Sequence, residues 1–89
     1  EIHLASTAKG RATVAWNNTN GATGYQVWYS TSKNGKYIKL TNCKADTRKY
    51  YKTGLKSGKK YYFKVRAYIK TESGYVYSSW STVKNVNVR

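Results

Sequence analysis

The chain has little of the chemistry that catalysis or metal binding needs. Its 89 residues include one cysteine, Cys43, and one histidine, His3, with no proline and no methionine. A single cysteine cannot form a disulfide within its own chain. One cysteine and one histidine also fall short of the about four ligands of a structural zinc site. We therefore expect no metal and no cofactor.

Acidic residues are equally scarce. They are Glu1, Asp46 and Glu72, and Glu1 stands at the first position, so acid–base catalysis by two facing carboxylates is nearly excluded. A catalytic triad would depend on His3, which lies close to a terminus of the kind that frays. We therefore expect that the protein is not an enzyme.

Long hydrophobic segments are also missing. No apolar run approaches the about 20 residues of a membrane-spanning helix, and no secretion signal opens the chain. A length of 89 residues suits one small domain. We expect residues 1–89 to form a single module, taken from a larger protein, without a membrane span.

Positive charge and aromatic side chains dominate what remains. There are 17 Lys and Arg against three Asp and Glu, and the aromatic residues are ten Tyr, three Trp and one Phe. High charge by itself would suggest disorder. However, apolar or aromatic residues recur at every second position along 12–16, 25–30 and 61–68. This alternation is typical of strands with one buried face.

Turn residues separate the alternating segments, and Asn34-Gly35 is the strongest of them because this pair favours a tight hairpin. We also expect a loop at 42–46 that contains Cys43. The pattern predicts an all-β, immunoglobulin-like sandwich of seven antiparallel strands in two sheets. The predicted strands are 2–8, 10–17, 23–32, 35–41, 47–53, 59–71 and 74–87.

The segment 55–67 resembles the signature of fibronectin type III domains. In that family a Leu and a Gly, here Leu55 and Gly58, precede a tyrosine corner, here Tyr61, and the strand that follows ends in Val-x-Ala, here 65–67. The resemblance implies that the Tyr61 ring packs in the core while its hydroxyl bonds to the loop backbone.

Other segments match the same family. Trp16 corresponds to its core tryptophan, 24–29 to a Gly-Tyr-x-Val-x-Tyr strand, and 77–81 to a Ser-x-Trp-Ser element. The residue pattern of these segments is similar to that of modules in secreted and wall-attached proteins of Gram-positive bacteria. The residues that we expect to hold the core together are Trp16, Tyr25, Leu55, Tyr61, Phe63 and Val65.

Several aromatic and cationic residues occupy the strand positions between the core residues and are therefore predicted to lie on an outer sheet face. One interpretation is a structural ladder in which Lys64 and Arg66 cover the rings of Trp28 or Trp80. The other is a binding platform for sugar rings or bases. The candidate binding residues are Trp28, Tyr62, Lys64, Arg66, Tyr68 and Trp80.

The lysine excess admits three explanations, namely solubility, attraction to a polyanion, or compensation for acidic neighbouring modules. Of the 17 cations, 13 are Lys and four are Arg. Sequence-specific nucleic-acid recognition relies on Arg, so we do not expect it.

These observations favour a non-catalytic module of a bacterial extracellular or wall-associated protein. It would act as a spacer or scaffold whose partners are the neighbouring domains of the same chain. The alternative is an adhesion module that binds carbohydrate or an anionic cell-wall polymer on its outer face.

Overall fold

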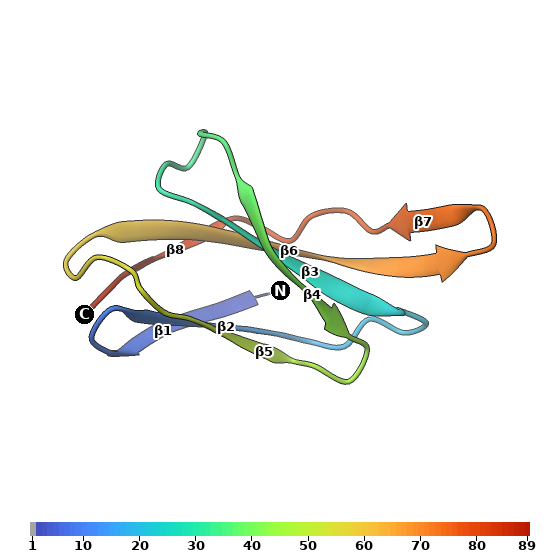
Figure 1. Cartoon of the computed structure of the whole chain (residues 1–89), viewed down its shortest axis with the longest axis horizontal. Coiled ribbons are helices and arrows are strands. Elements are labelled where there is room, and N and C mark those ends of the chain that lie inside the picture. Colours follow the sequence, from blue (N-terminus) through green and yellow to red (C-terminus); the bar gives the residue numbers. More distant parts are fainter. Residues whose placement is uncertain (1) are drawn as a thin grey trace.

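The computed structural model describes residues 2–89, so Glu1, the first residue of the expected module, lies outside the described residues. Two antiparallel sheets pack face to face (Figure 1). The smaller sheet has the order β1 (Ile2–Ala8), β2 (Arg11–Trp16) and β5 (Lys49–Lys52). The larger has the order β4 (Ile38–Lys44), β3 (Gly24–Ser30), β6 (Lys60–Thr71) and β7 (Gly74–Tyr77), and β8 (Lys84–Asn87) also pairs with β6. The predicted all-β sandwich is confirmed.

The described residues form eight strands because the predicted strand 74–87 is interrupted. Between β7 and β8, serine hydroxyls take over part of the pairing with β6. The backbone N–H of Ala67 donates to Ser78 Oγ and that of Val65 to Ser81 Oγ, both at 2.9 Å. The interruption therefore leaves these two donors of β6 satisfied, and it brings Trp80 over the sheet.

Two local predictions were wrong. Asn34-Gly35 does not form a tight hairpin, because β3 ends at Ser30 and β4 begins at Ile38. The loop instead contains a turn in which Gly35 N–H donates to the Ser32 carbonyl at 3.1 Å. Neither Asn34 nor Gly35 has a positive φ, whereas a two-residue hairpin of the favoured type needs positive φ at both central residues.

The second error concerns Cys43, which was predicted in a loop and lies in β4 instead. Its backbone pairs with Tyr25 of β3, and its side chain faces the core, where it is buried. The strand starts and ends later than predicted, and the register shifts between Val27 and Trp28, which leaves Leu40 as an extra residue. A bulge of this kind inserts one residue and changes which side chains face outward.

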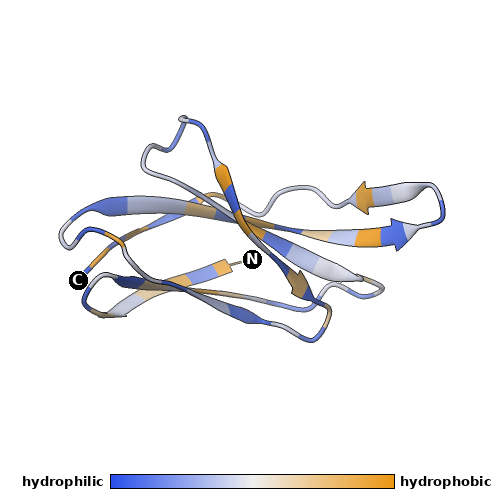
Figure 2. Cartoon of the chain, viewed as in Figure 1, coloured by the Kyte–Doolittle hydropathy of each residue, from blue (hydrophilic) through white to orange (hydrophobic). Residues whose placement is uncertain are grey.

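The core lies between the two sheets and is built by the alternation in the sequence (Figure 2). Val14, Val27 and Phe63 are completely buried, and the rings of Trp16 and Tyr25 are 5.7 Å apart. All six residues expected to hold the core together are buried: Trp16, Tyr25, Leu55, Tyr61, Phe63 and Val65.

The turn before β6 has the geometry of a tyrosine corner. The Tyr61 ring is buried, and its hydroxyl accepts a hydrogen bond of 3.0 Å from the backbone N–H of Lys56. Gly58 has a φ of 81°, a conformation that suits glycine. The corner ties the 55–59 loop to the core.

The two described ends of the chain lie at opposite ends of the β1–β2 hairpin. Ile2 pairs with Trp16 at the open end, whereas the Arg89 carbonyl accepts a hydrogen bond of 2.7 Å from Gly10 in the hairpin turn. The β6–β7 hairpin projects beyond the rest of the larger sheet (Figure 1). It accounts for part of the 43 Å length of the molecule.

Candidate functional site

The candidate residues come together on the outer face of the larger sheet. Antiparallel pairing places Gln26 opposite Arg66 and Trp28 opposite Lys64. Neighbouring strands turn every second side chain to the same face, so these four point away from the core. The central part of the face is therefore built from β3 and β6.

A column of alternating rings and cations runs across this face, and we call it the outer ladder. It consists of Tyr37, Lys64, Trp80, Arg66 and Tyr77. Lys64 Nζ lies 4.4 Å from the Tyr37 ring centre and 4.0 Å from that of Trp80. The Arg66 guanidinium carbon lies 4.4 Å from the Trp80 ring centre and 3.9 Å from that of Tyr77. These distances are within the range of favourable cation–π contacts.

Gln26 and Trp28 hold the outer ladder in place from the side of β3. The Trp28 and Trp80 rings meet edge to face with centres 5.5 Å apart. The Oε1 atom of Gln26 accepts hydrogen bonds from Trp28 Nε1 at 3.2 Å and from Arg66 Nε at 2.9 Å. Gln26 is only 6% exposed. The two tryptophans and two cations thus already contact one another, which favours the structural interpretation of these four residues.

Tyr68 lies apart from the outer ladder. Its ring crosses Gly24 of the neighbouring strand, and its hydroxyl donates a long hydrogen bond of 3.5 Å to the Cys43 carbonyl. The ring meets Tyr75 edge to face at 5.6 Å, and Tyr75 stacks on Tyr77 at 6.3 Å. Three tyrosines from β6 and β7 therefore gather beside the end of the ladder.

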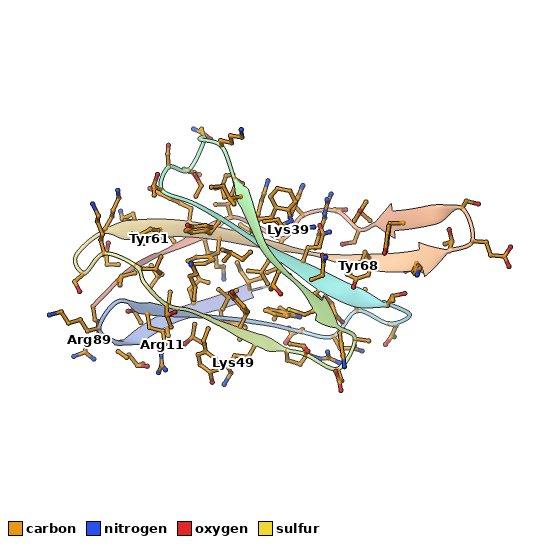
Figure 3. The ribbon with its side chains drawn as sticks, in the orientation of Figure 1. Arg11, Lys39, Lys49, Tyr61, Tyr68 and Arg89 are labelled. Atoms are coloured by element: carbon orange, nitrogen blue, oxygen red, sulfur yellow. The ribbon has the colours of Figure 1, made fainter. Side chains whose placement is uncertain are left out.

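These tyrosines border a shallow hollow, which we call the tyrosine hollow. Its volume is about 120 Å³, well below the about 300–1,000 Å³ of pockets that enclose a drug-sized ligand. Lys39 and Tyr68 lie on the side of the larger sheet in Figure 3. The residues that line the hollow are Gln26, Lys39, Asn42, Tyr68, Tyr75 and Tyr77.

The structure thus divides the six candidate residues into groups. Trp28, Lys64, Arg66 and Trp80 are joined in or against the outer ladder, and Tyr68 belongs to the tyrosine hollow. Tyr62 lies near the Tyr37 end of the ladder. Burial raises the pKa of the Tyr37 hydroxyl, and the nearby Tyr62 adds to the effect.

Sequence reasoning missed several residues of this face. Tyr75 and Tyr77 alternate with Val76, so the same period-two argument would have placed them beside Tyr68. Lys39 and Asn42 of β4 face the hollow only because of the bulge opposite Val27 and Trp28. No local pattern in the sequence indicates that bulge.

The remaining reactive groups offer little chemistry. Burial raises the pKa of the Cys43 thiol, an effect that the nearby Thr41 hydroxyl partly offsets, and a protonated thiol is a poor nucleophile. The described acids, Asp46 and Glu72, are both exposed in turns. Among residues 2–89 no three His, Cys, Asp or Glu side chains gather as they would to hold a metal ion. No helix in this range could cross a lipid bilayer.

Comparisons with known proteins agree with this architecture. The family model described as fibronectin type III domain matches residues 1–84. The chain is similar to a solved Fn3-like protein from Clostridium thermocellum, with 26% identity and a TM-score of 0.79 over 100% of this chain and 88% of that one. No curated protein matches the chain.

Two human domains share the fold at lower identity. The fn3 domain of the human collagen alpha-1(XX) chain has 19% identity and a TM-score of 0.76, over 98% of this chain and 79% of that one. The sixth such domain of human fibronectin type III domain containing protein 3 has 19% identity and a TM-score of 0.75, over the same shares.

Proposed function

The chain belongs to the fibronectin type III family, and we propose that it is a non-catalytic spacer module of a bacterial extracellular or wall-associated protein. The observation that carries this proposal is the placement of the two chain ends. Ile2 and Arg89 lie at opposite ends of the β1–β2 hairpin. Domains attached at the two ends are therefore held apart by the length of this hairpin.

The distance gained by one module follows from the strand length. β1 has seven residues, and at about 3.3 Å per residue it separates its two ends by about 20 Å. A folded sandwich keeps this separation fixed, whereas a flexible linker samples a broad range of distances. Rigid spacing is therefore what the fold contributes to its neighbours.

A non-catalytic role agrees with the scarcity of acid–base groups. Domains of this family are generally non-catalytic modules, and the two described acids lie in exposed turns and do not line the hollow. The similarity to the Clostridium thermocellum protein supports a bacterial source. Exposed apolar side chains on the projecting hairpin, Ile69 and Val76, offer contact area to a neighbouring domain of the same chain.

The spacer role is tested by exchange in the protein that carries this module. One variant lacks residues 1–89, and a second has them replaced by another fibronectin type III domain of similar length with an unrelated surface. A spacer predicts that deletion impairs the parent protein and that the foreign domain restores it. A folded replacement that fails to restore activity would contradict the spacer role. Labelling intact cells with an antibody against the module tests the extracellular location, which unlabelled intact cells with labelled lysates would refute.

A second role, adhesion to carbohydrate or to an anionic polymer, is favoured by one observation. The tyrosine hollow is not filled by the contacts of the outer ladder, and it combines aromatic, amide and cationic side chains. This role is compatible with spacing, because it uses a sheet face while spacing uses the two ends.

A further inference from the structure

The tyrosine hollow presents polar groups without partners. The hydroxyls of Tyr75 and Tyr77 and the side-chain amide of Asn42 make no hydrogen bond within the described residues. Tyr75 is 55% exposed and Tyr77 43%. These are groups that both donate and accept hydrogen bonds, as the hydroxyls of a sugar require.

The rings of the hollow are held in position by the surrounding structure. Tyr68 crosses Gly24, where an added Cβ would lie 2.6 Å from the tyrosine hydroxyl. The ring centre of Tyr77 lies 3.9 Å from the Arg66 guanidinium carbon, and Arg66 Nε in turn donates a hydrogen bond to Gln26. The outer ladder thus acts as a support for the hollow. Rings that are fixed before binding lose less conformational entropy when a ligand arrives.

The strands that border the hollow carry only positively charged residues among their charged side chains. Lys39 lines it, and the pairing of the strands places Lys44 opposite Gly24 and Lys70 opposite Tyr75. The strands of the larger sheet contain no Asp or Glu, and the whole chain has a formal net charge of +14. A ligand with negative charge is attracted to such a face.

We infer that the tyrosine hollow binds one acidic sugar residue of an anionic polysaccharide. The sugar ring packs on the tyrosine rings, its carboxylate faces Lys39, and its hydroxyls bond to Asn42 and the free tyrosine hydroxyls. A polymer fits better than a free small molecule, because the hollow is too small to enclose a ligand and lies open on a sheet face. This inference deepens the adhesive role and is independent of the spacer role.

Three features favour a polysaccharide over a nucleic acid. The cations beside the hollow are lysines, whereas phosphate and base recognition favours the planar fork of arginine. Arg66, the arginine of this face, is engaged with three rings and with Gln26. The free hydroxyls and the amide suit a ligand that carries many hydroxyls.

The test uses the whole chain and short fragments of polygalacturonate. Binding is measured by calorimetry and by backbone amide NMR shifts, with a neutral cello-oligosaccharide, polyphosphate and single-stranded DNA as comparison ligands. We expect saturable binding of polygalacturonate, with the shifts centred on β4, β6 and β7. The uronate is expected to bind more tightly than each of the three comparison ligands.

Two pairs of variants separate the hollow from general charge attraction. Tyr75→Ala and Lys39→Ala remove groups of the hollow. Tyr51→Ala and Lys49→Ala are matched controls on the opposite sheet. Tyr51 is 51% exposed, and Lys49 Nζ lies 6.0 Å from the centre of its ring. Each hollow variant should raise Kd by about fivefold or more, which corresponds to about 1 kcal/mol. Each control should change Kd by less than about twofold, which corresponds to a change in binding free energy of less than about 0.4 kcal/mol.

Several results would overturn the inference. Equal losses in the hollow and control variants would show attraction to charge alone. Equal or tighter binding of polyphosphate, DNA or the neutral sugar would show that the uronate is not what the hollow recognises. Shifts centred elsewhere on the wild-type chain would exclude the hollow even if a variant failed to fold. None of these results bears on the exchange test of the spacer role.

Discussion

Replacing Arg66 by alanine tests whether the outer ladder stabilises the fold. The wild-type guanidinium carbon lies 3.9 Å from the ring centre of Tyr77, 4.4 Å from that of Trp80 and 5.7 Å from that of Trp28. Its Nε also donates to Gln26 at 2.9 Å. The substitution removes all four interactions and leaves the backbone pairing of β6 unchanged.

The cost follows from typical values for each interaction. Three cation–π contacts at a partly exposed site contribute about 0.5–1 kcal/mol each, and the hydrogen bond contributes about 1 kcal/mol. Because Gln26 Oε1 keeps its bond from Trp28, the substitution leaves no buried acceptor unsatisfied. We expect the free energy of unfolding to fall by about 3 kcal/mol, out of about 4–13 kcal/mol for a domain of this size.

Urea unfolding followed by circular dichroism measures this change, and thermal unfolding checks it. A loss of 3 kcal/mol lowers Tm by about 10–25 °C in a domain of fewer than 100 residues. Lys70→Ala is the control, because it removes the same charge from an exposed position of the same strand and should change stability by less than about 0.5 kcal/mol. Arg66→Lys keeps the charge but loses the planar stacking and should fall between the two.

The reasoning fails if Arg66→Ala costs no more than Lys70→Ala. A double-mutant cycle with Trp80→Ala gives a second check, since side chains in contact show a coupling energy of about 0.5 kcal/mol or more. Additive effects of Arg66→Ala and Trp80→Ala would mean that the two side chains do not stabilise one another.

Three further predictions concern single residues. Gly24→Ala would place a methyl group against the Cys43 carbonyl and the Tyr68 ring; we expect a loss of at least about 2 kcal/mol by urea unfolding, and a stable variant would refute the packing described for Tyr68. Tyr61→Phe removes the acceptor of the Lys56 N–H and should cost about 1–2 kcal/mol with the fold retained, so an unchanged urea midpoint would argue against the tyrosine corner. The Cys43 thiol is buried and its pKa is raised, so it should react slowly with a thiol reagent at pH 8 in the folded protein and rapidly in urea. Equal rates in the two conditions would show that the thiol is exposed in the folded protein.

Most of the fold was predictable because strand periodicity is a local property. Val14, Trp16 and Phe63 stand at every second position of their strands and are buried as that period requires. The segment 55–67 indicated the tyrosine corner, since the Tyr61 hydroxyl needs a partner only five residues away. Patterns of this length can be seen in the sequence without knowledge of the partner strands.

Strand boundaries and the Asn34-Gly35 turn were less predictable. The side chain of Tyr37 donates to the Lys33 carbonyl at 2.8 Å, and the ring of Tyr37 packs on Lys64 of β6. These contacts stabilise a loop between β3 and β4 that is longer than the two-residue turn that Asn34-Gly35 favours. A preference worth little energy is overridden when the loop makes contacts with a distant strand.

The residue pattern is enough to predict the two-sheet sandwich, the buried aromatic core and a lysine-rich surface with outward aromatics. The contacts among those outward residues follow only from the way the strands pair in space. The bulge in β4 brings Lys39 and Asn42 beside Tyr68, and the interruption after β7 brings Trp80 between Lys64 and Arg66. Both features depend on pairing between strands far apart in the chain, so a period of two residues specifies which face a side chain occupies but not its neighbours there.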